Sequence, residues 1–227
     1  MQRIADAIRN HCAGARRVLR QPSAPLLDIA GRTVALSMRT LTVDIPQSGL
    51  KQAPRLRNDT VVRRVRRELE RALAATIPDR QVVVVTITAP IRRPARTVRV
   101  IEDRIRSVLV RRPREADIAA DILGNQVRIR LLSTIALRTA KLVLCVHQGA
   151  SDAQLLLNLT HSLIRTVGAA TSSCGGPTMM AQAWLVLTTP VAALPVALCR
   201  DILAQLGLRP KFSRIYLCRD GTVDLLT

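Results

Sequence analysis

Aromatic residues are almost absent from this sequence of 227 residues, which contains only Trp184, Phe212 and Tyr216. Aromatic side chains are the platforms on which proteins stack single-stranded bases, and they anchor many interfaces. The sequence therefore gives little support to recognition by base stacking. The hydrophobic fraction is nevertheless 48%, so the core is expected to consist of leucine, valine, isoleucine and alanine.

Paired cysteines and phosphate-binding loops are also missing. The cysteines are odd in number, are widely spaced and form no C-x-x-C pair; they are Cys12, Cys145, Cys174, Cys199 and Cys218. This argues against a zinc site and a disulfide framework, and it favours the cytoplasm or another reducing intracellular compartment. The motifs G-x-x-x-x-G-K-[ST], G-x-G-x-x-G and G-x-S-x-G do not occur in the chain. No metal site is predicted, and the sequence points to no particular cofactor.

Charge is absent from residues 166–199. An uncharged run of this length is long enough to suggest a membrane span. However, Gly175-Gly176-Pro177, Pro190 and Pro195 interrupt it. These residues favour a loop, a strand and the start of a helix, so no transmembrane segment is predicted.

Acidic residues are few: 16 Asp and Glu face 35 Lys and Arg, for a net charge of +19. Nearly all the basic residues are arginine, and residues 1–130 hold most of them. Such an excess predicts a polyanionic partner, nucleic acid above all, or an acidic protein. Binding by arginine–phosphate contacts without stacking would depend steeply on salt and would discriminate little between sequences.

Residues 1–57 are expected to form an extension to the main domain or a part of it. Residues 2–20 carry apolar side chains near helical spacing and five arginines against one aspartate. The pattern predicts an amphipathic helix, with an organelle-targeting peptide as the alternative. Short edge strands are expected over residues 33–45. Residues 58–227 are expected to form an α/β domain.

A run of β-branched residues marks the predicted centre of that domain. Residues 82–88 read Val-Val-Val-Val-Thr-Ile-Thr, which is typical of a strand buried on both faces. A helix pattern follows at 97–110, and the same order of strand and helix recurs at 142–167 and 183–206. The alternation predicts an α/β fold with a mainly parallel, three-layer sheet and helices on both faces.

Three further elements are expected between and after these units. Residues 115–123 are expected to form a short helix closed by Gly124-Asn125. Residues 126–132 alternate apolar and basic side chains, which predicts a strand with one solvated face. Asp220-Gly221, between two strand-like segments, predicts a C-terminal antiparallel β-hairpin.

Two groups of arginines are candidate anion-binding residues. A helix beginning near residue 58 should bury a stripe that includes Val61, Val65, Leu69 and Leu73. Its other face carries Arg63, Arg64 and Arg67, and the connection from the central strand to the next helix carries Arg92, Arg93 and Arg96. Arginines at a helix start suit phosphate groups. For the helix arginines the alternative is an ordinary solvated face, since Glu68 and Glu70 lie four residues from Arg64 and Arg66. For the second group the alternative is a plain connection between strand and helix.

The carboxyl ends of the predicted parallel strands form a second candidate site, because ligands of open α/β sheets bind there. The polar residues expected at this edge are Thr86, Thr88, His147, Gln148, Ser151 and Thr188. They suit a small anionic ligand. His147 is the candidate acid or base for catalysis, and a structural role for a lone strand-end histidine is the alternative.

Three functions are compatible with these patterns. The first is a basic α/β protein that binds nucleic acid or another polyanion through arginine–phosphate contacts. The second is an enzyme that acts on a small phosphorylated or carboxylated substrate at the strand-end edge. The third is a non-catalytic module that docks an acidic protein through its basic half.

Overall fold

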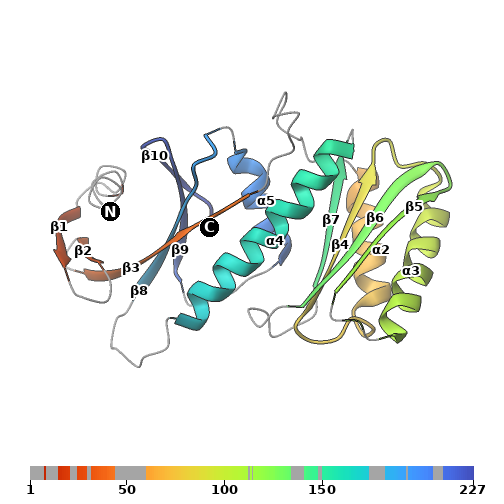
Figure 1. The fold of residues 1–227 in the computed structure, drawn as a ribbon, viewed down its shortest axis with the longest axis horizontal. Helices are drawn as coiled ribbons and strands as arrows, with labels where there is room; N and C mark the ends of the chain where they lie inside the picture. The colour runs from red at the N-terminus through yellow and green to blue at the C-terminus, as the bar shows by residue number, and fades with distance from the viewer. Residues whose placement is uncertain are drawn as a thin grey trace. The chain divides into compact units, whose positions relative to one another are not determined.

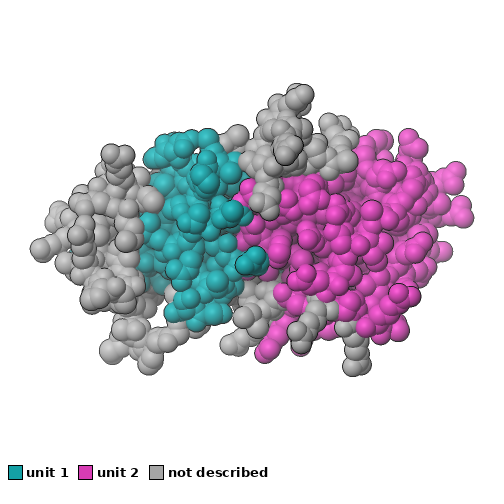
Figure 2. Space-filling model, in the orientation of Figure 1, with its two compact units in different colours: residues 1–42, 165–227 teal, residues 43–164 magenta. Residues whose placement is uncertain are grey.

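The computed structural model describes residues 8, 15–20, 25–29, 32–43, 60–111, 113, 115–133, 141–147, 150–173, 182–192, 194–206 and 212–227. The chain forms two compact units (Figure 2). Unit 1 comprises residues 1–42 and 165–227, and unit 2 comprises residues 43–164. The predicted division at residue 57 stays a prediction.

Unit 2 is built on a four-stranded sheet of order β5-β6-β4-β7. Its elements are α2 (Thr60–Leu73), β4 (Gln81–Thr88), α3 (Pro94–Val110), β5 (Ala116–Ile122), β6 (Asn125–Ser133), β7 (Lys141–His147) and the first part of α4 (Ala150–Ser173). β4 pairs antiparallel with β6 and parallel with β7. Residues 82–87 of β4 are all buried, which confirms the prediction of a strand buried on both faces.

Helices α2 and α3 cover one face of this sheet (Figure 1). Leu69 of α2 and Ile105 of α3 pack into one core with alternate strand residues such as Val83. On the opposite face, Arg128 of β6 bonds to Gln154 of α4. Helices therefore lie on both faces of the sheet, as the sequence predicts.

The predicted helix over residues 115–123 is wrong. This segment is strand β5, which pairs antiparallel with β6 through the two-residue turn Leu123–Gly124. Along β5 the burial alternates, with Ala116 and Ile118 partly buried and Asp117 and Ala119 exposed. A period of two fits the pleat of a strand, and pairing with β6 outweighs the helix propensity of the alanines.

Unit 1 contains a six-stranded sheet of order β1-β2-β3-β8-β9-β10. Its elements are β1 (Ala15–Arg20), β2 (Pro25–Ile29), β3 (Arg32–Thr40), β8 (Gln182–Thr188), α5 (Val196–Leu206), β9 (Arg214–Arg219), β10 (Thr222–Leu225) and the last part of α4. β8 lies between β3 and β9 and runs parallel to both. N-terminal and C-terminal segments thus share one sheet.

The predicted helix over residues 2–20 is wrong at its end, because residues 15–20 form β1 and pair antiparallel with β2. Its earlier residues, Ile8 apart, lie outside the described residues, and so does residue 58, near which the next helix is predicted to begin. The C-terminal hairpin is confirmed: β9 and β10 pair antiparallel around Asp220–Gly221.

The α/β class is confirmed. Parallel pairs join β3 to β8, β8 to β9 and β4 to β7, and the other pairs are antiparallel, so both sheets are mixed where the sequence predicted mainly parallel pairing. Within the described ranges, no helix has both the length and the apolar character needed to span a membrane.

Candidate anion-binding surface

Helix α2 separates its apolar and basic residues onto two faces. Val62, Val65, Leu69 and Leu73 are buried. Val62 takes the place predicted for Val61, which is 43% exposed. The opposite face carries four exposed arginines, Arg63, Arg64, Arg67 and Arg71. They border a shallow hollow together with Thr60 and Glu68, so α2 presents its guanidinium groups around a depression in the surface.

Two arginines of α2 are already neutralised by acids of the same helix. Arg64 Nε lies 2.7 Å from Glu68 Oε1, and Arg66 Nε lies 2.8 Å from Glu70 Oε1. Both are the i,i+4 pairs that the sequence spacing indicated. The hydrogen bond to Glu68 raises the pKa of the Arg64 guanidinium further above its ordinary value.

The row formed by Arg63, Arg67 and Arg71 is not paired in this way. These residues follow one another at intervals of four, which places their side chains along one line of the helix about 6 Å apart. No acid in the described part of the chain forms an ion pair with them. We call these three residues the α2 row. The sequence places Arg71 on the same basic face of the predicted helix, four residues after Arg67, but the predicted anion-binding residues do not include it.

The connection from β4 to α3 carries the second predicted group. Arg92, Arg93 and Arg96 are exposed. Arg93 stands before the first turn of α3 with φ 45° and ψ 56°, in the left-handed region, and Pro94 follows it. The first turn of the helix therefore begins beside three guanidinium groups.

A buried asparagine fixes this connection. Asn125 of β6 is 1% exposed. Its Oδ1 accepts a 2.7 Å bond from the Arg92 backbone N–H, and its Nδ2 lies 3.1 Å from the Arg92 carbonyl, 3.1 Å from Thr97 Oγ1 and 2.8 Å from the Ile122 carbonyl. Thr97 Oγ1 also donates to the Arg92 carbonyl, at 2.7 Å. The backbone that carries Arg92 is therefore held from two elements.

The two arginine groups lie at the same end of unit 2. Helices α2 and α3 both run from the end of the sheet where β4 finishes to the end where β4 begins (Figure 1). Arg106 Nη2 of α3 donates a 2.8 Å bond to the Ala72 carbonyl in the last turn of α2. Because the last turns adjoin, the first turns share the other end, with Arg63 and Arg64 on one helix and Arg96 on the other.

The whole segment from residue 60 to residue 111 is rich in exposed, unpaired arginine. It contains thirteen arginines against five acids. Ten of the thirteen are exposed and form no ion pair with an acid in the described residues. They are Arg63, Arg67, Arg71, Arg80, Arg92, Arg93, Arg96, Arg99, Arg104 and Arg111. Five of these ten, namely Arg63, Arg67, Arg92, Arg93 and Arg96, are anion-binding residues predicted from the sequence.

The strand-end candidates are only partly brought together. Thr88 of β4 is the register partner of His147 in β7, but Thr188 belongs to β8 in unit 1. Thr86 is fully buried and His147 is 4% exposed, and Thr88 Oγ1 donates to the Gln126 carbonyl at 3.1 Å. Gln148 and the side chain of Ser151 lie outside the described residues. Among the described residues, no cluster of His, Cys, Asp or Glu could hold a metal ion.

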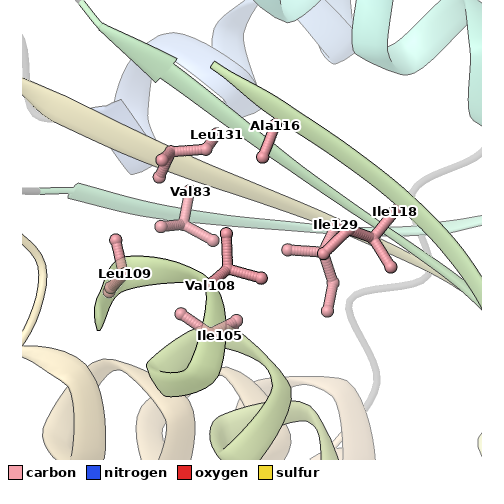
Figure 3. Close-up of a pocket in the computed structure, with 8 residues that line it drawn as sticks. All are labelled: Val83, Ile105, Val108, Leu109, Ala116, Ile118, Ile129 and Leu131. Atoms are coloured by element: carbon pink, nitrogen blue, oxygen red, sulfur yellow. The ribbon is translucent and has the colours of Figure 1, made fainter. Parts of the chain in front are cut away.

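A second hollow, between α3 and the strands β4, β5 and β6, is lined only by apolar side chains such as Val83, Ile105 and Leu131 (Figure 3). Its volume is about 10 Å³, about the room that one water molecule needs. It offers no polar group, so it is a packing gap beside β5 and not a ligand site.

The thiols of Cys199 and Cys218 in unit 1 are poor nucleophiles. Burial raises the pKa of Cys199 to about 12 and raises the pKa of Cys218 as well. The thiolate is the reactive form of cysteine. Both side chains therefore stay protonated at neutral pH. Cys174, in a predicted loop, lies outside the described residues.

Comparison of the chain with protein-family models, with curated proteins and with solved structures found no match.

Proposed function

We propose that the helical layer of unit 2, made of α2 and α3 with the connection before α3, binds a polyanion, nucleic acid above all. The observation that carries the proposal is that eight exposed arginines of this layer have no ion-pair partner in the described residues; they are Arg63, Arg67, Arg71, Arg92, Arg93, Arg96, Arg99 and Arg104. Like charges repel, so such a set lowers the stability of the free protein unless an anion screens it. The phosphate backbone of a nucleic acid carries a regular line of negative charges that can screen these arginines.

Arginine is the residue that suits this role best. Its planar guanidinium donates two parallel hydrogen bonds to a phosphate, where lysine offers a point charge. Contacts to phosphate carry no base information. The surface is therefore expected to bind many sequences with similar affinity, and each phosphate that it neutralises releases bound counterions.

The two alternative functions find less support. Enzyme chemistry at the strand-end edge would need Thr86 and His147 to reach a ligand, and both are buried. An acidic protein could dock on the same arginines. It would have to match their spacing with exposed acids, whereas a phosphate backbone offers one charge at every nucleotide.

Fluorescence anisotropy with a labelled 20-base-pair duplex of mixed sequence, titrated at about 50–300 mM salt, tests the proposal. Log affinity should fall linearly with log salt, with a slope of about −0.9 for each phosphate neutralised. Arg92→Gln/Arg93→Gln should weaken binding and reduce the steepness of the slope by about 1–2. Arg165→Gln/Arg200→Gln is the charge-matched control, since it replaces two exposed arginines of unit 1. It should change the salt slope less. Absence of binding at low salt would overturn the proposal.

A further inference from the structure

We infer that the nucleic acid that fits this surface is a duplex, contacted by α2 and α3 together, and not a single strand. This inference rests on the proposed function and narrows it. Three observations carry it: the position of the aromatic residues, the layout of the arginines on two helices, and the contacts that hold those helices in place.

The aromatic residues are in the wrong place for single-strand binding. The chain has three, and Trp184, Phe212 and Tyr216 are 3%, 5% and 1% exposed. All three belong to unit 1, where the Trp184 and Tyr216 rings pack against each other with centroids 5.3 Å apart. Single-strand binders gain about 1–3 kcal/mol for each base stacked on an aromatic ring. No aromatic side chain of this protein is free to supply that energy.

The arginines are laid out in two rows and not along one channel. The α2 row lies on one helix, and Arg96 and Arg99, which are three residues apart and which we call the α3 row, lie on the exposed side of the next. Packed helices lie about 8–10 Å apart, and helices of this length extend over about 20–25 Å. Two parallel rows of cations fit two backbones that face each other across a groove. A single strand presents only one backbone.

The two rows are held in fixed positions. The bond from Arg106 Nη2 to the Ala72 carbonyl, 2.8 Å long, joins α3 to the last turn of α2. At the other end, Asn125 holds the backbone of Arg92. DNA duplexes are stiff over about 150 base pairs. A rigid array of cations matches a stiff ligand without the ordering cost that a flexible strand would incur on binding.

The experiment compares a labelled 20-base-pair duplex with each of its single strands and with a thymidine homopolymer of equal length, at one fixed salt concentration. The expected result is a Kd for the duplex at least about tenfold lower than for any single strand. Arg96→Gln/Arg99→Gln should bring the two Kd values closer together. The remaining α2 row contacts only one phosphate backbone, and a single strand presents one backbone just as a duplex does. Arg165→Gln/Arg200→Gln, which removes two exposed arginines of unit 1, should leave the ratio of the two Kd values nearly unchanged.

Each other outcome has a distinct meaning. Equal or tighter binding of the single strands would overturn the duplex inference and leave the proposed polyanion function standing. Failure of every nucleic acid to bind at low salt would overturn both. Binding of poly-glutamate by a protein that ignores nucleic acid would also overturn both, and it would indicate an acidic protein as the partner.

Discussion

At the scale of single residues, Asn125 is the side chain on which the local structure depends most. It is 1% exposed and takes part in four hydrogen bonds, which join the start of β6 to the connection before α3 and to the turn after β5. Nothing in the sequence distinguished this asparagine from an ordinary turn residue after glycine. Its role became visible only once β5, β6 and α3 were placed together.

Replacement of Asn125 by alanine should therefore be costly. The change removes the side chain that satisfies the Arg92 N–H and leaves a gap beside Thr97, so the free energy of unfolding should fall by about 2–4 kcal/mol. Urea unfolding followed by circular dichroism measures the loss. Gln126→Ala, at the exposed neighbour that bonds to Asp121, is the control and should cost less than about 1 kcal/mol. Equal losses in the two variants would contradict the account.

Asp117 is the residue whose charge state should affect stability with pH. Arg128 donates to it through Nε and Nη2, each at 2.7 Å. The hydrogen bond with Arg128 lowers the pKa of the Asp117 carboxyl below 3.8, against the opposing effect of burial. A carboxyl whose pKa is lower in the folded state stabilises the protein above its unfolded pKa, and it loses that contribution as pH falls through the folded value.

Asp117→Asn should then destabilise the protein only where Asp117 is ionised. Both side chains of the pair are 34% exposed, so the loss at pH 7 should be about 0.5–1 kcal/mol. It should shrink as pH falls below about 4 and be lost as pH falls through the lowered pKa of the folded state. Urea unfolding of variant and wild type across this range measures it. Asp103→Asn, at an exposed acid for which the described residues hold no ion pair, is the control and should change the free energy of unfolding at pH 7 by less. A difference that stays constant as pH falls from 7 to the acid end of this range would contradict the assignment.

At the scale of elements, the β5–β6 and β9–β10 hairpins, whose turns are described, show what the sequence could and could not reveal. Both turns have two residues with positive φ, Leu123–Gly124 and Asp220–Gly221, as the hairpin turns that match strand twist require. Asp-Gly is the usual pair at such a turn, and it was recognised. Leu-Gly is not, because leucine seldom adopts positive φ. The first hairpin was therefore taken for a helix that ends at glycine.

Central elements could be predicted because their signals are long and uniform, as in the run from Val82 to Val85. Edge elements could not. β1 and β5 exist through pairing with a neighbour, and the arginines of residues 15–20 and the alanines of residues 116–120 carry weak strand signals. The division of the strands between two sheets was likewise invisible, which is why Thr188 was grouped with Thr86.

The glycines of the two turns offer a matched pair of substitutions. Gly124 and Gly221 both have φ +80°, and a side chain at either would be strained, so Gly→Ala should cost about 1–2 kcal/mol at each. At Gly221 nothing lies within 4 Å of the new Cβ, whereas at Gly124 it would lie 2.9 Å from Arg92 Nη1.

The two variants should differ in ligand binding more than in stability. The Arg92 guanidinium can swing away from the added methyl group at little cost, so urea unfolding should show similar losses for both. Duplex affinity should fall for Gly124→Ala and stay unchanged for Gly221→Ala once folding is confirmed for each. Equal affinity in the two variants would show that the position of Arg92 does not matter for binding.

At the scale of the whole molecule, exposed arginines without an ion-pair partner in the described residues gather on the layer formed by α2 and α3. The sequence predicted that arginine was the key to function, and the spacing of Arg64–Glu68 and Arg66–Glu70 correctly indicated internal pairing. What the sequence could not show is that α2 and α3 run in the same direction side by side. That arrangement places the exposed arginines of α3 on the same surface as the α2 row, although the two groups are more than twenty residues apart along the chain.

The distinction between paired and unpaired arginines on α2 is the most direct test of the proposed function. Arg63→Gln/Arg67→Gln and Arg64→Gln/Arg66→Gln each remove two positive charges from the same helix. Of these four arginines, only Arg63 and Arg67 form no ion pair within the described residues. The measurement is the slope of log Kd against log salt for a 20-base-pair duplex, in both variants and in the wild type. The prediction is a slope reduced by about 2 for Arg63→Gln/Arg67→Gln and by clearly less for Arg64→Gln/Arg66→Gln. Equal reductions, or a larger one in the second variant, would contradict the account.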